Sequence, residues 1–139
     1  MAVIVVKPSV FKNYLLKVGA DNYEKHVNSV SLTPSTTLVT VKGGTPDAVF
    51  TDQTSPTWVC DISYLQDWET ANSFSVYLLN NIGKTVAMEF SPLGSGPKFT
   101  ANVILTSGAA GGAIDAYGAS TVQLGVKGAP TFTAGTVTP

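Results

Sequence analysis

Arginine is absent from this 139-residue chain, and all eight basic residues are lysines. Arginine is the side chain best suited to hold phosphate or guanine through two parallel hydrogen bonds. The lysines are also scattered along the sequence instead of forming a cluster. Both features argue against tight or sequence-specific binding of nucleic acid, although they allow nucleic acid to pass along a weakly charged wall.

Charge of either sign is scarce. Charged residues make up 12% of the chain, and the formal net charge is −1, whereas globular proteins carry about 25% charged residues. A soluble chain with so little charge is expected to cover much of its surface with partners. The length and the 44% hydrophobic content are sufficient for one core, so we expect a single domain over residues 1–139.

Cysteine and histidine occur once each, as Cys60 and His26. One cysteine cannot form a disulfide within the chain, and the pair cannot build the usual zinc site. A thiol nucleophile needs a nearby base, but strand alternation places Cys60 and its neighbour Asp61 on opposite faces. Cys60 is therefore expected to be a small buried hydrophobe. No nucleotide-binding fingerprint or calcium loop occurs either, so we predict no enzyme, no metal and no cofactor.

Long hydrophobic runs are also missing. The apolar run at residues 2–6 ends at Lys7-Pro8 and is too short for a signal peptide or a membrane span. We therefore expect a protein made and folded in a cytoplasm, with no membrane partner.

Apolar and polar residues alternate over much of the chain, with turn residues at short intervals, which predicts an antiparallel β domain. The spacing becomes helical only over Asn72–Ile82, where Asn72 or Ser73 can cap the start and Gly83 suits the position after the end. Such a helix can cover one face or one open end of a sheet. The expected strands are residues 13–18, 26–33, 36–42, 58–64, 85–90, 98–106 and 120–126.

Residues 43–56 are predicted to form a long inter-strand loop, because they carry two glycines and two prolines with little periodicity. Loops of about this length in compact domains tend to be functional or mobile. Val49 and Phe50 are apolar residues within it. They either fold back onto the domain or dock onto another subunit.

A second loop, rich in glycine and alanine, is expected at residues 107–119. Ile114 and Tyr117 lie in this loop. We expect that they either pack within the domain or contact a neighbouring subunit. The tail at residues 127–139 is rich in proline, glycine and threonine. It is predicted to be a C-terminal arm, with a short added strand as the alternative.

Several segments follow one another in a specific order. A strand led by Trp58 is followed by "YLQDW", "VYLLNNIGKTVAMEFSP", "GPKFTANVILT", a glycine-rich loop and "STVQLGVKGAPTFT". With the earlier segment "NYEKHVNSVSLTP", this order resembles the small major tail (tail tube) proteins of long-tailed bacteriophages, especially those of actinobacterial hosts. The resemblance covers residues 13–133.

The resemblance implies a mainly β protein, an antiparallel sandwich or barrel-like domain flanked by one α-helix. It also implies a virion protein assembled in the host cytoplasm, with six copies in a ring and rings stacked into a hollow tail tube. Such a tube wraps a tape-measure protein, ends at terminator and tip proteins, and lets DNA pass without specific binding. Low charge and free strand edges agree with extensive subunit contact, and few cations would let DNA slide.

The alternative function is a β-sandwich decoration or adhesion module on a virion or cell surface. Composition alone does not separate it from a tube subunit. Deletion of residues 45–55 distinguishes them, because a decoration module should keep both its fold and its partner, whereas a tube subunit should fold but fail to stack.

Overall fold

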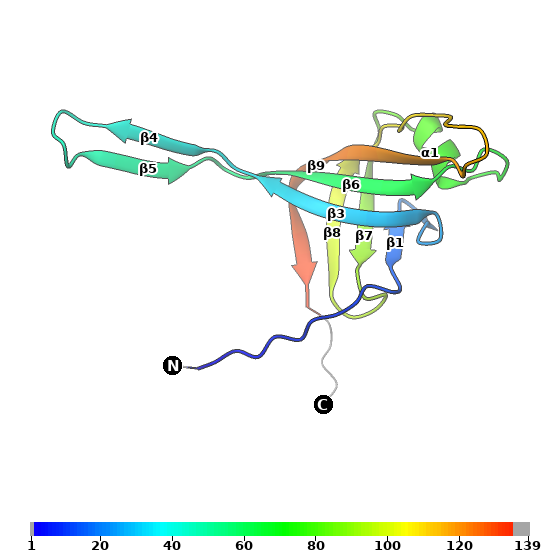
Figure 1. Cartoon of the computed structure of the whole chain (residues 1–139), viewed down its shortest axis with the longest axis horizontal. Coiled ribbons are helices and arrows are strands. Elements are labelled where there is room, and N and C mark those ends of the chain that lie inside the picture. Colours follow the sequence, from blue (N-terminus) through cyan, green and yellow to red (C-terminus); the bar gives the residue numbers. More distant parts are fainter. Residues whose placement is uncertain (1, 135–139) are drawn as a thin grey trace.

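The computed structural model describes residues 2–134, which form a bent β-sheet, one short helix and a projecting hairpin (Figure 1). The helix, α1, spans Phe74–Asn80. The strands are β1 (Leu15–Val18), β2 (Asp21–Asn22), β3 (Val27–Ser35), β4 (Leu38–Lys42), β5 (Val49–Gln53), β6 (Thr57–Leu65), β7 (Thr85–Ser91), β8 (Lys98–Ile104) and β9 (Ala119–Thr133).

Seven strands form one antiparallel sheet in the order β2-β1-β7-β8-β9-β6-β3, and β4 and β5 pair separately. The long strand β9 joins the two halves of the sheet. Residues 119–126 pair with β6, and residues 125–133 pair with β8. Figure 1 shows β9 bending where it passes from one partner to the other, so the sheet folds over itself around a core. The predicted mainly β, antiparallel fold with one helix is confirmed.

The pairing of β9 with β8 is irregular in the second half of β9. Asn102 of β8 pairs with Lys127 and Thr100 with Thr131, so one residue of β8 lies opposite residues 128–130. Extra residues of this kind bend a strand and leave backbone groups outside the ladder. The positive φ of Gly128, 75°, and the missing N–H of Pro130 are therefore tolerated there.

The predicted C-terminal arm is consequently wrong for residues 127–133, which continue β9. Residues 135–139 lie outside the described part of the chain.

The core lies between the two halves of the sheet, and α1 covers one end of it. Ser73 caps the helix, with Oγ accepting from the Val76 N–H at 3.4 Å, and Phe74 and Leu78 are fully buried. The helix is shorter than the expected Asn72–Ile82. It ends before Ile82, whose side chain is 56% exposed and does not pack in the core. The other large buried side chains of the core are Leu16, Val18, Tyr23, Ile62, Tyr64, Met88, Val103, Leu105 and Leu124.

The Cys60 side chain belongs to this core, as predicted, and is fully buried. Its Sγ lies 3.8 Å from Sδ of Met88. Burial, helped by the nearby charge of Asp61, raises the thiol pKa to about 12. The His26 ring packs against the ring of Tyr23, with centroids 5.8 Å apart. Within residues 2–134, no histidine or carboxylate hydrogen-bonds to the sulfur, so the structure assembles no thiol site there.

The strand expected at residues 26–33 ends later than predicted, because β3 continues through Pro34 to Ser35. β3 is an edge strand, where a missing N–H costs no ladder bond.

The helix found within residues 2–134 is too short to cross a bilayer.

Candidate subunit interface

The hairpin of β4 and β5 projects from the body of the protein (Figure 1). It continues the ribbon of β3 and β6, whose last pair is Ser35 with Thr57. Two bonds bridge the gap between the ribbons: the Thr54 N–H donates to the Thr37 carbonyl at 2.8 Å, and the Thr37 N–H donates to Thr54 Oγ1 at 3.0 Å. The predicted loop at residues 43–56 is therefore wrong over Val49–Gln53, which is a strand.

Val49 and Phe50 lie on opposite faces of this hairpin, because side chains alternate along a strand. Phe50 pairs with Val41 and shares its face with Val39. Val49 pairs with Lys42 on the other face, where the hydroxyls of Thr40 and Thr51 lie 3.3 Å apart. The face of Phe50 also carries Asp52, and the face of Val49 also carries Leu38 and Gln53. Three of four strand side chains are apolar on the face of Phe50, against two of six on the other, so the face of Phe50 is the more apolar one. We call Val39, Val41 and Phe50 the hairpin patch.

The hairpin patch is open to solvent. Val39, Val41 and Phe50 are 47%, 59% and 66% exposed, so neither Phe50 nor the half-exposed Val49 folds back onto the domain. An isolated two-stranded hairpin is marginally stable in water and gains stability by packing its apolar face. The hairpin is therefore chemically suited to contact another molecule.

The second candidate surface is the loop between β8 and β9, at residues 105–118. Gln66 holds its middle: Nε2 donates to the carbonyls of Gly111 at 2.9 Å and Ala119 at 3.1 Å, and Oε1 accepts from the Gly111 N–H at 2.8 Å. At the base of the loop, Tyr64 Oη accepts from the Gly108 N–H at 3.2 Å. A Cβ at Gly108 would lie 2.7 Å from that oxygen, so the close approach requires glycine.

Ile114 and Tyr117 stand on this anchored loop and are 90% and 94% exposed. Between them, Asp115 has a φ of 63°, in the left-handed region that turns the chain. Neither side chain packs within the domain. The structure thus places all four residues of the predicted interface at the surface, on two separate elements.

A third surface was not predicted. At the end of the core opposite α1, an apolar groove of about 360 Å³ opens between β3 and β6 on one side and β7 and β8 on the other. The indole N–H of Trp58 is buried beside it and has no hydrogen-bond partner in residues 2–134. Phe11 and Tyr14 close part of the opening. The remaining lining residues are Val30, Ser31, Leu32, Pro34, Phe90, Pro92 and Phe99.

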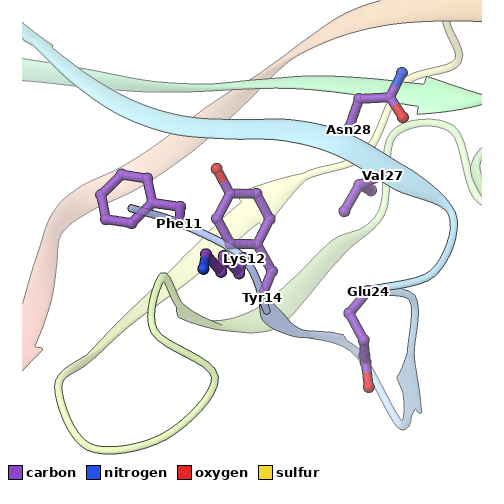
Figure 2. Close-up of a pocket in the computed structure, with 6 residues that line it drawn as sticks. All are labelled: Phe11, Lys12, Tyr14, Glu24, Val27 and Asn28. Atoms are coloured by element: carbon purple, nitrogen blue, oxygen red, sulfur yellow. The ribbon is translucent and has the colours of Figure 1, made fainter. Parts of the chain in front are cut away.

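The segment before β1 crosses the edge of this groove. Tyr14 packs edge-to-face against Phe90, with ring centroids 5.1 Å apart. The ring centroids of Phe11 and Tyr14 are 6.2 Å apart. Figure 2 shows Phe11 and Tyr14 beneath β3, where they also line a smaller cavity of about 170 Å³ with Lys12 and Glu24. Sequence pattern missed this arrangement, because Phe11 lies before the first expected strand and the pattern of residues 13–18 does not show which elements Tyr14 contacts.

Residues 2–10 precede these aromatic residues and form neither helix nor strand. Figure 1 shows this segment running away from the body of the protein. Val3, Ile4, Val5 and Val6 are 91%, 92%, 89% and 80% exposed. We call residues 2–10 the N-terminal segment.

No family model and no curated protein matches the chain. Its fold is similar to that of two solved chains. One comes from the virion of a native gene transfer agent particle, with a TM-score of 0.68 and 10% sequence identity. The other comes from the tail of an empty gene transfer agent particle with C6 symmetry, with a TM-score of 0.68 and 11% identity. Each match covers 91% of this chain and 100% of the other. The chain therefore has the fold of a component of a gene transfer agent tail.

Proposed function

We propose that this protein is a structural subunit of a phage-like tail, and specifically of the tail tube. The observation that carries the proposal is the fold, which aligns over 91% of this chain with the whole of a chain from a sixfold-symmetric tail. In this proposal six copies form a ring, and rings stack into a hollow tube through which the genome is delivered.

The surface of the protein supports assembly. Large apolar side chains are exposed on the hairpin patch, on the loop at residues 105–118 and on the N-terminal segment. Soluble monomers rarely expose extended apolar surfaces, and such surfaces mark interaction sites. The low charge of the chain adds little repulsion between copies. We assign Val49, Phe50, Ile114 and Tyr117 to contacts between subunits, with Phe50 as the main contact on the hairpin.

The further partners follow from this role. The tube would surround a tape-measure protein, end at terminator and tip proteins, and let DNA pass through its lumen without specific binding. Each phosphate contact by a cation adds affinity through counterion release. A chain with eight lysines and no arginine would therefore slow the passage of DNA little. The subunit would assemble in the host cytoplasm and remain in the virion tail.

Sedimentation velocity over a range of concentrations, together with negative-stain electron microscopy, tests self-assembly. We expect rings or tubes of uniform diameter, either spontaneously or after a trigger such as salt, because a subunit that waits for its template must not polymerise early. A sample that stays monomeric under every condition, combined with intact tubes in particles that lack this protein, would contradict the proposal. A decoration module would instead bind an assembled particle without forming tubes.

A further inference from the structure

We propose that the apolar groove beside Trp58 is the docking site for the N-terminal segment of a second copy of this chain. The inference rests on the proposed self-assembly and names the two surfaces that one contact between copies would join. The groove supplies an apolar channel. The N-terminal segment supplies exposed, extended apolar residues.

The groove favours an apolar occupant. Water alone would leave its apolar side chains wet, among them Leu32 and Phe99. The Trp58 N–H is unpaired within the described chain, but its nitrogen has almost no accessible surface, so an occupant of the groove would not reach it. An extended peptide suits the groove, since its alternate side chains fill an apolar channel.

The N-terminal segment matches this requirement. Residues 2–6 are consecutive apolar residues, four of them β-branched, and β-branched residues favour extended backbone. An extended chain would turn Val3 and Val5 to one side and Ile4 to the other. One row of side chains could then enter the groove while the other row faces away from it.

The geometry of the segment favours another copy over its own groove. Phe11 already lies at the rim, so residues 2–6 would need a sharp reversal within residues 7–10 to return. Proline holds the residue before it in extended conformations, which keeps the chain straight at Lys7-Pro8. Figure 1 shows the segment leading away from the body. Its nine residues reach about 30 Å when extended, which is enough to meet a neighbouring subunit.

Cross-linking between two full-length variants tests the contact. One variant carries Ile4→Cys and the other Leu32→Cys, and the two are mixed, assembled and mildly oxidised. All variants also carry Cys60→Ala, because Leu32 lies directly opposite Cys60 on the neighbouring strand and a cysteine at position 32 would compete for Cys60 within its own chain. We expect a disulfide between the two different chains, identified by mass spectrometry of the linked peptides. Pro34→Cys, at an exposed position lining the groove, is a second acceptor if Leu32→Cys fails to fold.

The matched control replaces the acceptor with Lys84→Cys, an exposed position at the other end of the sheet, just before β7. Docking of the N-terminal segment raises the local concentration of the cysteine at position 4 near the groove. We therefore expect roughly tenfold more mixed dimer with Leu32→Cys or Pro34→Cys than with the control. Equal yields would overturn the inference. A disulfide that forms only within one chain carrying both Ile4→Cys and Leu32→Cys would also overturn it, since the segment would then occupy its own groove.

Electron microscopy of the same mixtures separates this inference from the proposed function. Rings or tubes without the mixed disulfide would reject the docking of the N-terminal segment and leave the tube proposal standing. Absence of both assembly and mixed disulfide would reject both.

Discussion

The side-chain amide of Gln66 forms two hydrogen bonds with the backbone of Gly111, one to its carbonyl and one from its N–H. Nε2 of Gln66 donates to the Gly111 carbonyl at 2.9 Å, and Oε1 accepts from the Gly111 N–H at 2.8 Å. The same Oε1 accepts from the indole N–H of Trp68 at 3.1 Å. The Gln66 side chain thus holds the middle of the loop that exposes Ile114 and Tyr117.

Replacing Gln66 by leucine should release this loop. The substitution keeps the approximate volume but removes three hydrogen bonds to Gly111 and Ala119, and each net hydrogen bond at such exposed positions contributes about 0.5 kcal/mol. We expect faster amide hydrogen exchange at residues 109–118, with a local opening free energy lower by about 1–2 kcal/mol. Gln123→Leu, at an exposed position of β9, is the control and should leave exchange in the loop unchanged. Equal exchange in both variants would show that Gln66 does not anchor the loop.

The two faces of the hairpin should differ in their effect on assembly. Phe50→Asp places a second negative charge on a face that already carries Asp52, whereas Val49→Asp places one opposite Lys42. We expect Phe50→Asp to abolish assembly in sedimentation and microscopy and Val49→Asp to weaken it less. Both side chains are exposed, so the melting temperatures should stay close to that of the parent. A stronger defect in Val49→Asp would assign the contact to the other face.

The thiol of Cys60 should react only after the protein unfolds. It is fully buried, and its pKa is raised to about 12, first by burial and then by the charge of Asp61. The stabilisation linked to this raised pKa is present below the unfolded value, about 8.5, and is lost as pH rises toward 12. We expect a thiol reagent at about pH 8 to label the denatured chain quickly and the native chain at the rate of global unfolding. Fast labelling of the native chain would contradict the buried placement.

Asp67 should make the corner before α1 sensitive to acid. Hydrogen bonds from the side chain of Thr70, and then from the backbone N–H groups of Thr70 and Glu69, lower the carboxyl pKa. A lowered pKa stabilises the fold above the unfolded value, about 3.9, and this contribution is lost as pH falls through the folded pKa. Asp67→Asn keeps an acceptor without the charge, so its melting temperature should fall less between pH 5 and pH 2. If the melting temperatures of parent and variant change identically with pH, Asp67 does not cause the loss of stability in acid.

Much of the fold was predictable because burial imposes a period of two. The row of Cys60, Ile62 and Tyr64 on β6 is buried as expected, since one face of that strand contacts the core. The helix was recognised from the same kind of signal, and its cap is Ser73. Its end was placed two residues too late, because Ile82 continued the apolar spacing without a core to meet.

The errors have a common physical origin. The sequence predicts a loop where β5 forms, because all five residues of β5 are exposed and no buried face imposes a pattern on "VFTDQ". It predicts an arm where β9 continues, because Gly128 and Pro130 are typical turn residues, whereas here they occupy an irregularity of the ladder. The groove beside Trp58 is formed by residues from β3, β6, β7 and β8 together. No local pattern reports such a combination.

Cryo-electron microscopy of the full-length protein in its assembled form tests most directly whether it is a tail tube subunit. We expect a hollow tube of stacked sixfold rings in which the hairpin patch is buried against a neighbouring subunit. A particle with another architecture, or one in which Phe50 remains exposed to solvent in every copy, would contradict it.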